Sequence, residues 1–210
     1  MGGCLVIVFS AFLCGCESEE ARKAREDKDA SAYYKEAEAH YEAARWEEAI
    51  VAYQKAVALK PNYAEAYFRM GVIHFRSGRG LMLDDHIEAM ACYKKAIPAF
   101  KKAVATKPYY AEAYCYMGDC YRFYLTCKRR QLDLLDQDTV EAHFGGKSAY
   151  EKAIAIKPDD VRAYYGMADC CAGVESIAIY KKIIAIKPDE VTAYLFMGFE
   201  YVDLGQHTDA

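Results

Sequence analysis

The sequence has no excess of positive charge, few prolines and no apolar run long enough to cross a membrane. A net charge of −4 at pH 7 argues against a nucleic-acid-binding module, because such modules usually present a basic face to phosphates. Only 5 of the 210 residues are proline, which favours long helices over a loop-rich scaffold. The apolar stretch at residues 4–16 is shorter than the roughly 20 residues that a spanning helix takes. What remains, 54% hydrophobic and 28% charged residues, is enough to bury a substantial core.

Motifs typical of catalytic, metal-binding and cofactor-binding sites are also missing from the sequence. The spacing of Cys115, Cys120 and Cys127 is not the paired CxxC of a zinc site, and the chain has no CxxCH haem motif, glycine-rich phosphate loop or nucleophile elbow. No histidine is spaced from a carboxylate or cysteine as catalysis or zinc binding requires; the histidines are His40, His74, His86, His143 and His207. The sequence therefore predicts no catalytic residue, no metal and no cofactor.

The chain does contain one sequence motif in four copies. Each copy reads Lys-Pro, four variable residues, Ala-Tyr, two residues, and Met followed by Gly or Ala. The tyrosine always lies six residues after the proline and the methionine nine. The prolines are Pro61, Pro108, Pro158 and Pro188. Constant internal spacing of this kind indicates a structural repeat.

The residues before each proline form an apolar helical stripe. Ala49, Tyr53 and Ala56 lie twelve, eight and five residues before Pro61, and similar residues occupy these offsets in the other copies. Since proline cannot continue a helix, each repeat is predicted to consist of two helices, A and B, with the proline closing B.

This alternation resembles the tetratricopeptide repeat, a helix-turn-helix unit of about 34 residues. In the first repeat the characteristic positions are occupied by Tyr33, Ala37, Ala49, Tyr53, Ala56 and Pro61. The resemblance implies an all-α, right-handed superhelical solenoid of antiparallel helix pairs over residues 30–210, with about four repeats and a truncated fifth. One repeat cannot bury its own faces, so stacking supplies the core.

The repeats differ in length. Successive prolines are 47, 50 and 30 residues apart, and we expect the surplus of the two long repeats as insertions near residues 76–84 and 125–137. Asp85 with Glu88, and Asp138 with Glu141, have the spacing of an N-cap and its reciprocating glutamate. The B helix at about residues 86–105 contains Pro98, where we expect a kink, with a broken helix as the alternative.

The last repeat matches the pattern through Tyr194, Gly198 and Gly205 and stops at Ala210. With no B helix to cover it, helix A is expected to leave Tyr194, Met197 and Tyr201 partly uncovered. We interpret the sequence as a fragment of a longer reading frame.

Two pairs of residues, one of cysteines and one of glycines, are interpreted as structural. Cys120 and Cys170 occupy the same repeat position, where a small apolar residue is needed, so they are expected to fill the core, with a disulfide between neighbouring A helices as the alternative. The glycine pair Gly145 and Gly146 is expected to mark a close helix contact or a local break.

The N-terminal segment resembles a bacterial lipoprotein signal peptide. Residues 4–16 have the length of a signal-peptide core and end in Leu13-Cys14-Gly15-Cys16, which is similar to a lipobox. The resemblance implies removal of residues 1–15, lipidation of Cys16 and a location in the bacterial cell envelope facing the periplasm. Residues 16–29 would then form a charged tether or a solvated helix extension. An uncleaved membrane anchor and a cytoplasmic protein are the alternatives.

In the repeat family the concave surface is lined by helix A and holds a peptide. Carried over by position, the groove comprises Tyr34, Glu38, Phe68, Arg69, Tyr116, Asp119, Tyr165, Asp169 and Phe196. Aromatic residues beside carboxylates would suit a peptide with apolar anchors and some positive charge. Several of these residues could instead pack between repeats. Tyr34 and Glu38 replace the Lys and Asn that clamp a terminal carboxylate in the chaperone-binding subset, which argues against that ligand.

The two expected insertions would lie side by side on one edge. Their basic residues, Arg76, Arg79, Lys128, Arg129 and Arg130, would face an acidic partner or lipid headgroups, or would simply be solvated. The sequence thus predicts a non-catalytic protein-interaction scaffold tethered to a membrane, an assembly factor for an envelope complex by analogy, with no nucleic acid and no small-molecule substrate. The alternatives are a soluble adaptor and a regulatory module of a longer protein with an enzyme domain beyond residue 210.

Overall fold

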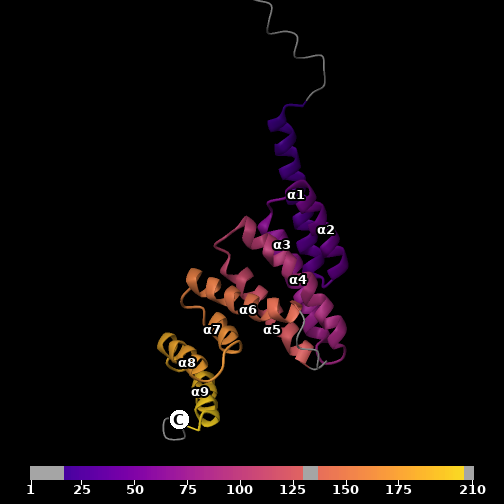
Figure 1. The fold of residues 1–210 in the computed structure, drawn as a ribbon. Coiled ribbons are helices and arrows are strands. Elements are labelled where there is room, and N and C mark those ends of the chain that lie inside the picture. The colour runs from indigo at the N-terminus through magenta and orange to yellow at the C-terminus, as the bar shows by residue number, and fades with distance from the viewer. Residues whose placement is uncertain (1–16, 130–136, 206–210) are drawn as a thin grey trace, which may run out of the picture.

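The structure, a computed structural model, describes residues 17–129 and 137–205. Within these ranges the chain forms helices and no strands (Figure 1). The helices are α1 (Glu19–Glu42), α2 (Trp46–Leu59), α3 (Ala64–Leu81), α4 (His86–Thr106), α5 (Ala111–Arg129), α6 (Gln137–Ile156), α7 (Val161–Ala168), α8 (Val174–Ile186) and α9 (Val191–Asp203).

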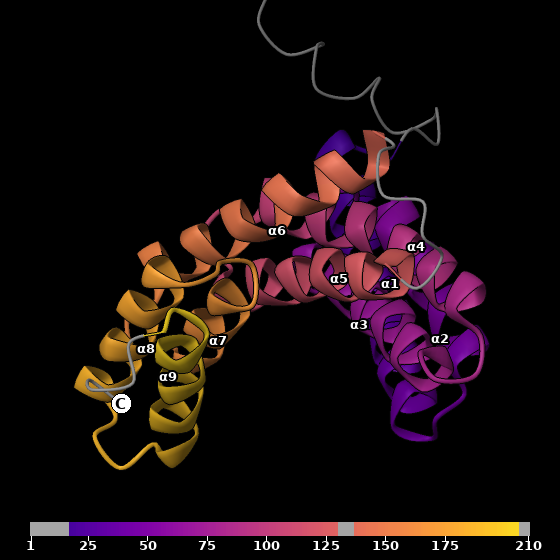
Figure 2. The same ribbon diagram turned by 60° about the horizontal axis from the view of Figure 1, so that its bottom comes forward.

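Consecutive helices pair and the pairs stack. The A helices α1, α3, α5 and α7 each pack against the B helix that follows, and α9 is the A helix of the last repeat. Figure 2 shows the pairs following an arch, with α1–α4 in one leg, α7–α9 in the other, α6 on its outer side and α5 beneath α6. The all-α solenoid predicted from the repeats is confirmed.

Small residues on A helices receive aromatic rings from B helices. A Cβ added at Gly71 of α3 would lie 2.7 Å from the ring of Phe100 on α4, and one at Gly118 of α5 would lie 2.7 Å from the ring of Tyr150 on α6. Phe100 and Tyr150 are completely buried. The same residue pairs therefore let the helices approach closely and fill the space between them.

The surplus residues of the long repeats lengthen helices, which corrects the expected position of the insertions. Residues 76–81 belong to α3 and residues 125–129 to α5. The reason is that the added turns have partners of their own: a Cβ at Gly78 would lie 2.8 Å from the ring of Tyr93 on α4, and Phe75 contacts the same ring. Both long A helices thus continue their buried face.

The predicted start of α4 is confirmed and that of α6 is not. Asp85 accepts hydrogen bonds from the backbone N–H groups of Ile87 and Glu88 at 2.9 Å. Asp138 lies inside the first turn of α6, because the helix already begins at Gln137. α4 runs through Pro98 as one helix, so the broken-helix alternative is excluded.

None of the described cysteines forms a disulfide, so no disulfide joins neighbouring A helices within these residues. Cys120 is completely buried, as expected of a core residue, and Cys170 is half-buried. A Cβ at Gly145 would lie 2.8 Å from the ring of Tyr121, so the expected close helix contact is present. His207 lies outside the described residues.

Candidate protein-interaction surfaces

The carboxylates predicted to line the groove are engaged within the protein. Glu38 of α1 accepts a hydrogen bond from the hydroxyl of Tyr53 on α2 and another from Arg69 on α3 at 2.9 Å. Burial, followed by the hydrogen bond to Glu38, raises the pKa of Tyr53, so the phenol is held as a donor. Glu38 therefore joins the two helices of its own repeat to the next repeat.

Asp119 on α5 forms the same junction two repeats later. Its carboxylate accepts hydrogen bonds from the hydroxyl of Tyr150 on α6 and from Arg162 on α7, both at 2.6 Å. Arg122 lies 3.6 Å from Asp119 and pairs with Asp169 at 2.9 Å. Because Asp119 is only 7% exposed, it cannot be a ligand contact, which corrects the prediction for this residue.

The predicted aromatic residues differ in accessibility. Phe68 is buried against Phe100, Tyr110 and Tyr116, so its assignment to the groove is also corrected. The physical reason is that the next repeat covers this position. Half-buried or exposed residues remain as possible contacts: Tyr34, Glu38, Arg69, Tyr116, Tyr165, Asp169 and Phe196.

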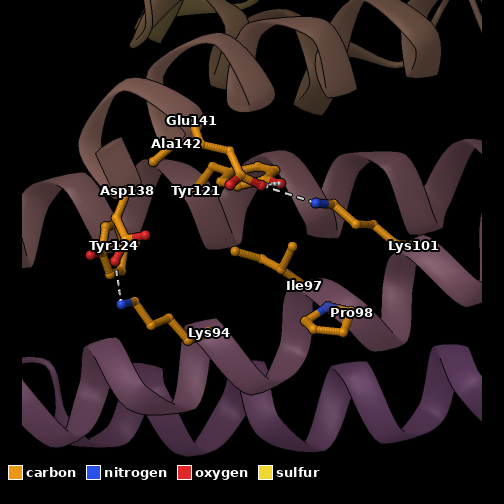
Figure 3. A pocket seen from close by; sticks show the side chains of 9 residues that line it. All are labelled: Lys94, Ile97, Pro98, Lys101, Tyr121, Tyr124, Asp138, Glu141 and Ala142. Atoms are coloured by element: carbon orange, nitrogen blue, oxygen red, sulfur yellow. Dashed lines mark hydrogen bonds and ion pairs between the residues drawn. The ribbon is translucent and has the colours of Figure 1, made fainter. Parts of the chain in front are cut away.

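A pocket that sequence reasoning missed lies between the B helices α4 and α6 (Figure 3). Its volume is about 260 Å³, and Ile97, Pro98 and Ala142 contribute apolar surface. Two ion pairs cross between the helices: Lys94 with Asp138 at 2.5 Å and Lys101 with Glu141 at 3.0 Å. The remaining lining residues are Tyr121 and Tyr124.

These ion pairs neutralise the charges at the pocket. The hydrogen bond from Lys101, followed by its charge, lowers the pKa of Glu141. Both lysines are therefore already paired with carboxylates, and the surface between the two ion pairs is apolar. No cluster of histidine, cysteine and acidic residues suited to a metal ion occurs in residues 17–129 and 137–205.

Among the helices that the structure describes, α9 exposes the most large apolar side chains. Leu195, Phe199 and Val202 are 58%, 62% and 49% exposed. Tyr194 is exposed and Met197 half-buried, as expected, but Tyr201 is buried, which corrects that prediction. Lys181 of α8 lies over the Tyr201 ring, so the preceding B helix covers this residue.

Comparison with known proteins addresses the family and the fold. The tetratricopeptide repeat family model matches residues 37–78. No curated protein is matched by the chain. Among solved structures, a MamA protein is 22% identical with a TM-score of 0.65, covering 86% of this chain and 85% of that one. MamA from Desulfovibrio magneticus RS-1 is 20% identical with a TM-score of 0.60, covering 85% and 87%.

YrrB, described as a tetratricopeptide-repeat (TPR) protein with an unusual peptide-binding site, is 19% identical with a TM-score of 0.57, covering 91% of this chain and 86% of that one. The fold is a TPR solenoid. At these identities the likeness establishes the fold alone.

The basic residues at the ends of the long TPR A helices do not form one free edge. Arg76 lies over the ring of Tyr41 on α1, 5.4 Å from its centroid, and Arg79 lies over Phe123 on α5 at 4.8 Å. Lys128 is buried, which corrects its assignment, while Arg129 is exposed. Arg130, like Cys16, lies outside the described residues.

The described part of the TPR solenoid has no helix that combines the length and hydropathy of a membrane span. The N-terminal turns of α1 are helical, charged and exposed over residues 19–29, and Ser18 caps them by accepting a hydrogen bond from the N–H of Ala21 at 3.1 Å.

Proposed function

We propose that this TPR solenoid is a non-catalytic scaffold that binds a peptide or protein segment along the inner side of its arch. The observation that carries the proposal is a set of half-buried or exposed aromatic side chains on four of the A helices, Tyr34 on α1, Tyr116 on α5, Tyr165 on α7 and Phe196 on α9. Aromatic residues supply large contact area at low entropic cost and dominate many interfaces. The peptide-binding site named for YrrB supports the same use of the fold.

The internal pairing refines the expected ligand. Arg69 and Arg162 occupy the carboxylates of Glu38 and Asp119, so these groups do not offer free negative charge. Arg162 also lies over the ring of Tyr116, 4.2 Å from its centroid. We therefore expect recognition through apolar anchors of an extended or helical segment, with charge contributing less than the sequence alone suggested.

The binding experiment selects peptides from a displayed random library on the purified chain. Selected peptides are expected to carry aromatic or aliphatic anchors and to lose at least ten-fold in affinity for the double variant Tyr165→Ala and Phe196→Ala. Tyr109→Ala is the matched control, since Tyr109 is 84% exposed in the turn before α5. Equal binding to wild type and the double variant would remove the inner side from consideration.

We further propose that lipidated Cys16 tethers the scaffold to the bacterial envelope, where it serves assembly of an envelope complex. The exposed start of α1 supports this, because residues 19–29 form a helix about 16 Å long at about 1.5 Å per residue, a rigid spacer between anchor and solenoid. Mass spectrometry of the mature protein is expected to show a diacylglyceryl group on Cys16 at the N-terminus, absent in Cys16→Ser. An intact Met1 would refute the tether without affecting the scaffold.

A further inference from the structure

We propose that the segment bound on the inner side of the arch carries acidic side chains, and that these bind Arg76 and Arg79 of α3. The inference rests on the proposed function and adds the charge of the partner segment to it. Position in the repeat alone favoured a positively charged segment, because the carboxylates of the groove were expected to be free.

The carboxylates on this side of the arch already have cationic partners. Glu38 and Asp119 each accept a hydrogen bond from an arginine of the next A helix, at 2.9 Å and 2.6 Å. Asp169 pairs with Arg122 at 2.9 Å. A positively charged segment would have to break these pairs to find a counter-charge, so the groove does not favour one.

Arg76 and Arg79 differ from the arginines that form these pairs. Both side chains are exposed, and among the described residues neither guanidinium group forms an ion pair with a carboxylate. Glu42, at the end of α1, is exposed and pairs with neither of them. Because the two arginines lie three residues apart in α3, they are neighbours on one face of the helix. Two unpaired positive charges therefore lie close together.

Aromatic rings of the two adjacent A helices hold these arginines in place. Arg76 lies over the ring of Tyr41 on α1, 5.4 Å from its centroid, and Arg79 lies over the ring of Phe123 on α5 at 4.8 Å. Guanidinium groups stack favourably on aromatic faces. A side chain that is already held in this way loses less conformational freedom when it binds an anion. The pair is therefore better prepared for a carboxylate than two freely solvated arginines would be.

The arginine pair is continuous with the aromatic residues that carry the proposed function. Tyr116 on α5 contacts Phe75, the residue before Arg76, with ring centroids 5.2 Å apart. The Tyr41 ring also holds Arg69, at 4.9 Å, which belongs to the predicted groove. A segment anchored on Tyr116 would therefore bring its flanking side chains to the arginine pair. Apolar anchors supply most of the affinity, and the charge selects among segments that carry such anchors.

The test selects the displayed random peptide library in parallel on three forms of the purified 210-residue chain. These are wild type, the double variant Arg76→Gln and Arg79→Gln, and the control double variant Lys95→Gln and Lys102→Gln. The control removes two positive charges from exposed side chains of the B helix of the same repeat, and Lys102 also lies over a ring, that of Tyr67, at 5.2 Å. Glutamine keeps the helix propensity of arginine and lysine nearly unchanged.

We expect peptides selected on wild type and on the control to be enriched in Asp and Glu beside their apolar anchors. Peptides selected on the Arg76→Gln and Arg79→Gln variant are expected to lack this enrichment. A synthetic acidic peptide from the wild-type selection, labelled for fluorescence anisotropy, is expected to bind this variant at least ten-fold more weakly than wild type at low salt. The control is expected to bind it within about two-fold of wild type, and high salt should reduce the difference, since exposed charges are screened.

Two outcomes would overturn the acidic segment while leaving the proposed function in place. One is selected peptides with apolar anchors and no enrichment in acidic residues, and the other is equal binding of the acidic peptide by wild type and by the arginine variant. A selection that yields no peptide on wild type would remove both proposals.

Sedimentation with phosphatidylglycerol vesicles separates a peptide from a lipid surface. If wild type binds these vesicles, the arginine variant does not, and the selected peptides bind both forms equally, the arginines contact lipid headgroups and the acidic segment is wrong. Vesicle binding that is the same for both forms, together with the expected loss of peptide affinity, supports the acidic segment. Circular dichroism of the arginine variant is expected to match that of wild type, because both side chains are exposed.

Discussion

Arg162 of α7 donates a hydrogen bond to the carboxylate of Asp119 on α5 at 2.6 Å, across the boundary between two repeats. The hydroxyl of Tyr150 on α6 reaches the same carboxylate. One carboxylate therefore joins three helices, two from its own repeat and one from the next. Glu38 repeats this arrangement with Tyr53 and an arginine of the following A helix.

Asp119→Ala is expected to lower the free energy of unfolding by about 3–5 kcal/mol, because it leaves Tyr150 and Arg162 without their shared acceptor in a largely buried site. Urea denaturation measures the change. Asp169→Ala is the control, since that side chain is 47% exposed and forms an ion pair with Arg122; we expect a loss of less than about 1 kcal/mol. Similar losses for both variants would show that Asp119 is not a structural junction.

Gly71→Ala is expected to destabilise the chain by about 1–3 kcal/mol, since the new methyl meets the Phe100 ring at 2.7 Å. Gly80→Ala, in the same helix with open space around it, is expected to stabilise by up to about 1 kcal/mol through helix propensity. Thermal unfolding of both variants compares the two effects directly. A stabilising Gly71→Ala would mean that the ring of Phe100 moves aside without cost.

The helix pairs could be predicted because their determinants are local. The proline that ends each B helix, and the glycine or alanine opposite an aromatic ring such as Phe100, recur at fixed intervals in the chain. The extra turns of α3 also have a signal in the sequence, because Phe68, Phe75 and Gly78 lie on one helical face. A repeat of standard length ends before this face does, so it hides the signal.

The pairing of the groove carboxylates could not be predicted from spacing. Asp119 and Arg162 are far apart in sequence, and their contact depends on how much each repeat rotates relative to the last. Position in the repeat identified Asp119 correctly as lying on helix A, but whether it faced solvent or an arginine was decided by the packing of α7. The same holds for Phe68, which the next repeat buries.

His74 of α3 is expected to make stability depend on pH. Burial, followed by the charge of Lys95, lowers its pKa below the ordinary value of 6.5, so the folded protein favours the neutral ring. As the pH falls below about 6.5, the unfolded chain takes up this proton first, and the free energy of unfolding decreases until the folded-state pKa is reached.

His74→Gln, which does not titrate, is the comparison for that prediction. Wild type is expected to lose free energy of unfolding relative to His74→Gln as the pH falls from 8 to 5. Urea denaturation of both proteins at each pH measures this difference. A difference that stays constant over this range would contradict the lowered pKa. Other titrating groups are common to both proteins and cancel in the difference.

Pro98 is expected to cost stability within α4. Proline has no N–H to donate to the carbonyl of Lys94, four residues earlier, and its ring crowds that carbonyl. Pro98→Ala restores the donor, so the free energy of unfolding is expected to rise by about 1–3 kcal/mol, as urea denaturation would measure. A loss of stability would instead mean that the helix geometry at Pro98 is required to bring Lys94 and Lys101 to Asp138 and Glu141. Lys94→Met, introduced into wild type and into Pro98→Ala, tests this second explanation. If it holds, Lys94→Met costs stability in wild type but not in Pro98→Ala, where the ion pair is already lost.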